Sequence, residues 1–375
     1  MTLHLVTPEY PPMPGGVSDY TLNVAHALAQ TGEEVHVWCP PIAPEPATTG
    51  VVVHPDFGTF AARDLERVGR LLDGFDPPRR LIVQWVPHGY GRRAMNVGFC
   101  AWLWKRARHG DRVELMVHEP YLAFWEGSWR QNAAGVVQRV MIVLLLRAAR
   151  RVWVSIPAWT VALRPYAMGR ALPFVWLPIP SSLAEPDAHE VATVRERLGA
   201  APLAGHLGTY GRLVTDLLDR IVEALLAASP QTRILLMGFA SDRYAEEFSR
   251  QFPELSGRVL ATGTLDSDDL ARHVAACDVL LQPFPDGVSS RRTSVMAGMK
   301  LRVPVVTTRG RLTERLWETT GAVRLAEVGD SSGFVAHAAA LMAAPDDRER
   351  LADAARRMYD EHFAIDHTVR ALELA

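Results

Sequence analysis

Short apolar strands alternate with helical segments along almost the whole chain, a pattern typical of parallel sheets joined by crossover helices. The first half carries predicted strands at residues 2–7, 34–39, 80–86, 112–118 and 151–156. The second half carries them near 204–208, 233–237, 259–262, 278–282, 303–307 and 323–325. Between the halves, residues 174–186 are rich in proline and serine, which indicates a linker.

The alternation predicts an α/β chain of two Rossmann-like doubly wound domains facing a cleft. We expect the first domain to span residues 1–180 together with a C-terminal helix at about 360–375, and the second to span 181–359. A chain of 375 residues with 48% hydrophobic content is long enough for two cores. In such folds, working loops follow the carboxyl ends of the strands.

Composition and charge exclude several classes of function. The net charge of −2, with no basic stripe, argues against nucleic acid as a partner. Three widely spaced cysteines form neither a disulfide framework nor a CxxC metal site, so we expect no bound metal and a reducing compartment. No signal peptide is readable, and the longest apolar run, 140–146, is far shorter than the ~20 residues of a membrane span. We expect a cytoplasmic protein.

The loop after the predicted strand at 278–282 has the composition of a phosphate site. It ends where a helix begins at about residue 293, and helix N-termini favour anions. Arginine and hydroxyl side chains add charge and hydrogen-bond donors. The candidate phosphate-binding residues are Asp286, Gly287, Val288, Ser289, Ser290, Arg291, Arg292 and Thr293. The alternative is an ordinary turn with a capped helix and solvated arginines.

Two other strand-to-helix loops are candidates for anion binding. Gly15 and Gly16 precede a predicted helix that begins near Ser18 and carries Asp19 in its first turn. In the second half, a strand is followed by Gly208 and Thr209, with Arg212 at the start of the next helix. Glycine lets the backbone approach a ligand closely, and backbone N–H groups can contact phosphate. Each loop can also be a plain helix-entry turn.

His118 and Glu119 end a predicted strand, where a doubly wound fold places working residues. They are our candidate catalytic residues, although a histidine with only a structural hydrogen bond is the alternative. Nearby loops supply candidate acceptor-side residues, namely Asp19, His88, Tyr90, Tyr121 and Trp125. Aromatic rings there suit sugar stacking, lipid contact or ordinary packing. Arginines on the following predicted helix would allow a weak peripheral contact of the protein with a membrane.

Taken in order, these segments resemble the retaining glycosyltransferases of family 4, also called group 1, which have the GT-B fold. The resemblance covers GGVSDYTLNVAHALAQTGEEVHVWCPP, LPIPSSL and DVLLQPFPDGVSSRRTSVMAGMKLRVPVVTT. It implies transfer of a sugar from a nucleotide-sugar to a hydroxyl, with retention and without a required metal. It also implies that Gly15 and Gly16 lie beside the diphosphate, that His118 contacts the donor sugar, and that Arg212 grips the diphosphate.

The chain departs from the family pattern at two places. Thr215 and Asp216 stand where the family has a lysine after the arginine. The family's second glutamate, expected to hold the ribose, is replaced by Ala297 in one alignment and by Ser294 in another. We hypothesise that the two adjacent arginines, Arg291 and Arg292, compensate for the missing lysine charge.

The resemblance thus predicts a cytoplasmic hexosyltransferase-type enzyme of carbohydrate biosynthesis, acting as monomer or homodimer. Its donor would be a UDP- or GDP-type sugar, with no other cofactor. Its acceptor would be a hydroxyl of a glycan, a glycosylated metabolite or a lipid-linked compound. The alternatives are a catalytically silent relative that binds a nucleotide or a partner protein, and a nucleotide-sugar epimerase.

Overall fold

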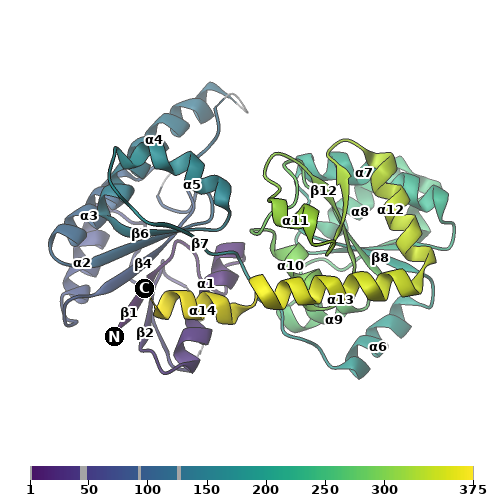
Figure 1. Cartoon of the computed structure of the whole chain (residues 1–375), viewed down its shortest axis with the longest axis horizontal. Coiled ribbons are helices and arrows are strands. Elements are labelled where there is room, and N and C mark those ends of the chain that lie inside the picture. The colour runs from purple at the N-terminus through teal and green to yellow at the C-terminus, as the bar shows by residue number, and fades with distance from the viewer. Residues whose placement is uncertain (1, 43–48, 92–93, 125–127, 375) are drawn as a thin grey trace. The chain divides into compact units, whose positions relative to one another are not determined.

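The chain folds into two compact units, each built around its own parallel sheet (Figure 1). The computed structural model describes residues 2–42, 49–91, 94–124 and 128–374. One unit comprises residues 1–178 and 365–375, and the other comprises residues 179–364. We call them the first and the second domain.

The first domain contains a seven-stranded sheet with the order β3-β2-β1-β4-β5-β6-β7, in which every pair is parallel. Its strands are β1 (Leu3–Val6), β2 (Val35–Trp38), β3 (Val51–His54), β4 (Arg80–Trp85), β5 (Arg112–Val117), β6 (Ala149–Val154) and β7 (Phe174–Trp176). The central strands are buried on both faces, as expected of a sheet covered by crossover helices. Two strands, β3 and β7, were not predicted from the sequence.

Helices cover both faces of this first sheet. They are α1 (Gly16–Gln30), α2 (Ala62–Leu72), α3 (Val97–Arg108), α4 (Trp129–Ala148), α5 (Pro157–Leu163), the 3₁₀ helix η2 (Arg164–Ala167) and α14 (Ile365–Glu373). The last of these packs against α1, and the guanidinium of Arg80 donates to the Leu372 carbonyl at 2.6 Å. The C-terminal end of the chain is therefore part of the first domain.

The second domain contains a six-stranded parallel sheet with the order β10-β9-β8-β11-β12-β13. Its strands are β8 (Leu203–Leu207), β9 (Arg233–Met237), β10 (Val259–Ala261), β11 (Val279–Gln282), β12 (Val305–Arg309) and β13 (Arg324–Glu327). Its helices are α6 (Ala188–Leu198), α7 (Arg212–Ala228), α8 (Ser241–Gln251), η3 (Pro253–Arg258), α9 (Ser267–Ala275), α10 (Thr293–Lys300), α11 (Arg315–Thr319), α12 (Ser331–Ala343) and α13 (Pro345–His362). The predicted doubly wound α/β architecture is confirmed.

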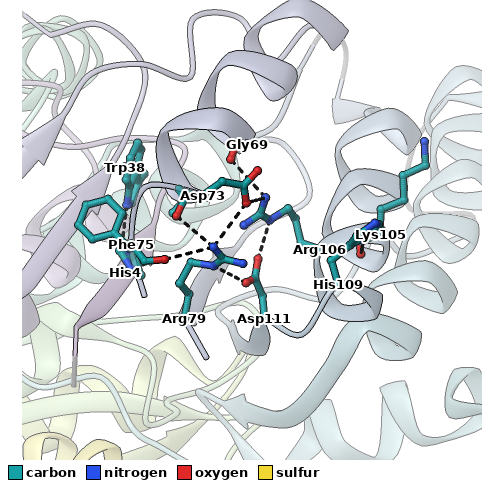
Figure 2. Close-up of polar contacts among 11 residues, drawn as sticks. His4, Trp38, Gly69, Asp73, Phe75, Arg79, Lys105, Arg106, His109 and Asp111 are labelled. Carbon is teal, nitrogen blue, oxygen red and sulfur yellow. Dashed lines mark hydrogen bonds and ion pairs between the residues drawn. The ribbon is translucent and has the colours of Figure 1, made fainter. Parts of the chain in front are cut away.

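A buried network of charges ties the amino ends of β4 and β5 to the helices of the first domain (Figure 2). The Asp111 carboxylate accepts from Arg79 Nε at 2.6 Å and from Arg106 Nε at 2.5 Å. Asp73 Oδ1 accepts from Arg106 Nη1 at 2.7 Å and lies 3.5 Å from Arg79 Nη1. Two arginines and two aspartates thus balance one another, at the edge of the first sheet opposite the carboxyl ends of β4 and β5.

Candidate functional site

The strand order in the second domain reverses between β8 and β11. From β8 the chain continues through α7 to β9 on one side, and from β11 it continues through α10 to β12 on the other. Such a reversal leaves an opening at the carboxyl ends of the two strands, where doubly wound folds bind ligands. We call this place the β8/β11 edge.

The loop from 283 to 292, which leaves β11, is held tightly against β12 and the turn after it. Val288 N donates to the Thr308 carbonyl at 2.8 Å, and Leu312 N donates to the Asp286 carbonyl at 2.9 Å. Gly287 has φ +86°, and a Cβ there would lie 2.3 Å from Gly310 N. Only glycine fits this close approach of two backbones. The loop is therefore a fixed platform.

Arg291 and Arg292 share one carboxylate within this loop. Arg291 Nη2 donates to Asp286 Oδ2 at 2.7 Å, and Arg292 Nη2 donates to Asp286 Oδ1. The Arg292 guanidinium also stacks over the Phe284 ring, 4.3 Å from its centroid. Two positive groups and one negative group leave one net positive charge. Asp286 therefore orients both arginines, and the hypothesis that this loop compensates for the missing lysine charge stays a prediction that rests on the one remaining charge.

Two other predicted donor-binding residues are already engaged within the protein. Ser290 N donates to Glu314 Oε1 at 3.0 Å, and its hydroxyl donates to the same carboxylate. Trp317 Nε1 adds a third donor at 2.8 Å, while burial raises the pKa of Glu314. The amide of Val288 is taken by the Thr308 carbonyl. Ser290 and Val288 therefore shape the loop, and we withdraw them as direct phosphate contacts.

Buried polar atoms without a hydrogen-bond partner among the described residues lie at the same edge. They are Gln282 Nε2, Ser289 Oγ and His206 Nε2. Gln282 Oε1 accepts from Ser294 Oγ at 2.8 Å, and His206 Nδ1 donates to the Leu281 carbonyl at 2.7 Å. Buried polar groups normally find partners. These three atoms are therefore places where ligand hydroxyl or phosphate groups could bind.

The loop after β8 forms the other side of the edge. Gly208 N donates to the Met237 carbonyl at 3.1 Å, and a Cβ on Gly238 would lie 2.4 Å from the Gly208 carbonyl oxygen. Thr209 and Arg212 are exposed, and Arg212 makes no ion pair within the described residues. Its positive charge at the start of α7 is available to a ligand.

In the first domain, the N-terminus of α1 already holds a carboxylate. Glu9 Oε1 accepts from Val17 N and from Ser18 N, each at 3.1 Å. A Cβ on Gly15 would lie 2.2 Å from this carboxylate oxygen. The amides of Val17 and Ser18 are therefore taken by Glu9, and the prediction that Gly15 and Gly16 lie beside a diphosphate stays a prediction. Desolvation, followed by the Glu9 charge, raises the pKa of the Asp19 carboxyl nearby.

His118 is buried at the end of β5 and paired with a second strand-end residue. Its Nε2 lies 2.9 Å from Gln84 Oε1, and because a carbonyl oxygen only accepts, Nε2 carries the proton. The Tyr20 ring meets His118 edge-on, with ring centroids 4.9 Å apart. Burial lowers the pKa of His118 to about 3. The ring is neutral at physiological pH and keeps an Nδ1 lone pair.

The remaining predicted residues are divided between surface and core. His88 is exposed, Glu119 is half-buried, and Tyr121 is half-buried with its hydroxyl donating to the Ala162 carbonyl at 3.1 Å. Tyr90 was predicted on the acceptor side, but it is fully buried, stacks on Trp85 and Phe99, and donates to the Gln84 carbonyl. That assignment is corrected. Trp125 lies outside the described residues.

The sequence analysis did not identify several residues that shape the β8/β11 edge and the candidate residues of the first domain. They are Glu9, Gln84, Gln282 and Glu314. Gln84 and Gln282 stand at or next to strand ends, which is a readable signal. The two glutamates act on backbone amides elsewhere in the chain, and no local pattern points to them. No cluster of three or more His, Cys, Asp or Glu side chains suited to a metal occurs in the part of the chain that the structure describes.

We expect Gly287→Ala to weaken nucleotide binding and to destabilise the second domain. The new Cβ would overlap Gly310 N, and alanine at φ +86° is strained by about 1–2 kcal/mol in addition. Gly257→Ala is the matched control, because a Cβ there has no neighbour within 4 Å. Urea unfolding and nucleotide titration of both variants check this. Equal behaviour of the two variants would show that the loop is not rigid.

Buried neutral histidines predict a stability that falls in acid. For His118, with pKa about 3 in the folded chain, the unfolded state binds more protons below about pH 6.5. The free energy of unfolding therefore decreases as the pH falls. Relative to its value above pH 7, the part due to His118 is lower by about 1.4 kcal/mol at pH 5.5. Urea unfolding at pH 7.5 and 5.5 is compared between the wild type and His118→Gln. The variant should lose less stability on acidification, and an identical loss would refute the assignment.

Comparison with known proteins supports the same architecture. Residues 204–361 match the family model of the glycosyl transferases group 1. A search of curated proteins finds no match. The structure of HepE from Anabaena in complex with UDP and glucose superposes with TM-score 0.72 at 18% identity, covering 99% of this chain and 98% of that one.

Two further solved structures show the same fold. Sucrose-phosphate synthase from Thermosynechococcus elongatus has TM-score 0.76 at 15% identity, covering 100% of this chain and 97% of that one. A glycosyltransferase from Rickettsia africae has TM-score 0.74 at 12% identity, with coverage of 100% and 97%. At these identities the likeness shows the fold alone. The chain has the GT-B fold, and its second domain matches the group 1 glycosyl transferases.

Proposed function

We propose that this protein is a glycosyltransferase that takes its sugar from a nucleoside-diphosphate sugar bound at the β8/β11 edge. The observation that carries the proposal is the fixed loop in which Asp286 orients Arg291 and Arg292 beside the N-terminus of α10. Forked donors and a net positive charge at a helix N-terminus are what a diphosphate needs. The family match of residues 204–361 covers this loop.

The leaving group determines what these residues contribute. As the bond from the anomeric carbon to the phosphate oxygen breaks, negative charge builds on the diphosphate. Fixed donors stabilise that charge more than they stabilise the bound substrate, so they accelerate the reaction. Arg212 is proposed to add a third guanidinium from the start of α7. Thr293 at the start of α10, Ser289, and the backbone at Gly208, Thr209 and Gly287 complete the proposed donor site.

Retention is proposed to follow from a front-face displacement that requires no metal. The acceptor hydroxyl oxygen bonds to the anomeric carbon on the face that the diphosphate leaves, and its proton passes to the departing phosphate oxygen. His118, neutral and with Nδ1 available, is proposed to accept a hydrogen bond from the donor sugar. Glu119 stays a candidate catalytic residue only because it follows His118 at the end of β5.

The donor is proposed to be a UDP- or GDP-linked hexose, and UDP is the first to test. HepE, which shares the fold, has been solved with UDP and with UDP-glucose. Gln282 and Ser294 are proposed to hold the ribose in place of the family's missing carboxylate, since their side chains pair at 2.8 Å. The acceptor is proposed to be a hydroxyl of a glycan, a glycosylated metabolite or a lipid-linked compound. Asp19, His88 and Tyr121 remain its candidate contacts in a cytoplasmic protein, monomeric or homodimeric.

Calorimetric titration of the full chain with UDP, GDP, ADP and TDP tests the donor site. We expect one nucleotide to bind clearly more tightly than the others, and Gln282→Ala to weaken that nucleotide more than it weakens inorganic pyrophosphate. No binding of any nucleotide would contradict the proposal. Binding without turnover of the matching nucleotide-sugar would favour a silent relative. Conversion of the donor sugar without an acceptor would favour an epimerase.

A further inference from the structure

Helix α4 of the first domain has apolar residues on two opposite faces. One face, which includes Met141, Ile142 and Leu145, is buried in the domain core. The opposite face carries Trp129, Val136 and Val140, whose exposed fractions are 74%, 55% and 51%. Positions 129, 136, 140 and 147 lie within about 20° of one line along a helix of 3.6 residues per turn. We call this line, which ends in the exposed Arg147, the α4 stripe.

The α4 stripe groups three exposed apolar side chains on one face of the helix, whereas exposed apolar residues are usually scattered singly. From Trp129 to Val140 its exposed apolar residues span about 17 Å at 1.5 Å per residue, and Arg147 lies beyond them. Beside it, Arg139 donates to the Leu122 carbonyl at 3.1 Å and lies 3.6 Å from the Phe124 ring centroid. This contact fixes the partly exposed Leu122 and Phe124 next to the helix. Contiguous exposed apolar surface of this kind usually marks an interaction site.

The charged side chains along the stripe and in the sequence after it are basic, although Glu126 stands three residues before Trp129 in the sequence. Residues 127–184 contain no Asp or Glu but seven arginines, although the whole chain has a net charge of −2. Helix α3 packs beside α4 (Figure 1). It also lacks acidic residues and exposes Lys105 and Arg108. On α4 itself, Arg130 and Arg147 lie at the two ends of the stripe. An apolar stripe in such surroundings is complementary to a surface that is both apolar and anionic.

We propose that the α4 stripe docks the protein on the surface of an anionic lipid bilayer. Tryptophan and valine side chains would enter the boundary between headgroups and acyl chains, while the arginine stems extend toward lipid phosphates. Among the described residues no helix is long and apolar enough to cross a membrane, so the helix would lie in the plane of the surface. Each arginine near an anionic leaflet strengthens such binding. This inference does not depend on the proposed glycosyl transfer.

Sedimentation of the full chain with vesicles tests the docking surface. We expect binding to vesicles that mix phosphatidylglycerol with phosphatidylcholine, and weaker binding as salt is raised. The triple variant Trp129→Glu, Val136→Glu, Val140→Glu should bind these vesicles at least about tenfold less tightly. The pair Arg130→Gln, Arg147→Gln should reduce binding to the anionic vesicles and flatten its salt dependence.

The matched control is Val52→Glu, which changes a valine of the same domain that is 48% exposed on β3. It should bind vesicles like the wild type, and circular dichroism with thermal unfolding should show that all variants fold. Equal binding by the triple variant and the wild type, or no binding of the wild type to anionic vesicles, would overturn the proposal. A wild-type dimer that the triple variant converts to monomer, without vesicle binding, would assign the stripe to a second copy of this chain instead.

Discussion

Replacing Arg292 with alanine is expected to lower kcat/KM for the nucleotide-sugar by about 10²–10³-fold, the usual cost of one fixed donor to a developing negative charge. The loop would change from one net positive charge to zero, because Asp286 would then pair with Arg291 alone. The stacking of the guanidinium over Phe284 would also be lost. Initial rates with varied donor concentration measure the effect, which should fall on kcat as well as on KM.

Arg350→Ala is the matched control for this measurement, since Arg350 is an exposed arginine of α13 that pairs with Asp347. Asp286→Asn separates charge from orientation. It raises the net charge of the loop but loosens both arginines, so it should also lower kcat. An Arg292→Ala enzyme with unchanged turnover and donor affinity would remove this loop from the mechanism.

Replacing Asp111 with alanine is expected to destabilise the first domain by about 3–5 kcal/mol, because it leaves two buried guanidinium groups without their shared carboxylate. Among the described residues, Arg79 and Arg106 would retain Asp73, which is partly exposed, as their only carboxylate, together with the backbone carbonyls of Phe75 and Gly69 (Figure 2). Urea unfolding followed by far-ultraviolet circular dichroism measures the change in the free energy of unfolding.

Asp73→Ala is the control within the same network. Its side chain is 58% exposed, so its loss should cost under about 1 kcal/mol. Asp73 belongs to the first domain and the candidate nucleotide site to the second, so nucleotide affinity should be unchanged in Asp73→Ala. Equal destabilisation by the two variants would show that burial does not determine the strength of this network.

The fold was readable from the sequence because strand and helix signals alternate with the spacing of crossover units. The two strands that were not predicted are short and lie at sheet edges. Strand β7 has three residues and lies between Pro173 and Pro178, so its composition indicates a linker. Only its parallel pairing with β6, which aligns Val152 with Phe174 and Val154 with Trp176, reveals it as a strand.

The candidate site was only partly predictable from the sequence. The sequence places Asp286, Arg291 and Arg292 in one loop, but not the sharing of a single carboxylate, which depends on side-chain geometry. Glu314 holds Ser290 from 24 residues away. Tyr90 lies in a polar loop, yet it packs in the core because its ring fits between two other aromatic rings. Partners that are distant in sequence leave no local pattern.

The most direct test of the central claim is incubation of the full chain with nucleotide-sugars, with and without glycan, glycoside and lipid-linked acceptors. Released nucleoside diphosphate and the glycosylated product are measured together. We predict that one donor releases its diphosphate only with an acceptor, in equal amount to a product whose new linkage keeps the donor's anomeric configuration. Release of no diphosphate from a donor whose nucleotide binds, across the whole acceptor panel, would contradict glycosyl transfer by this protein.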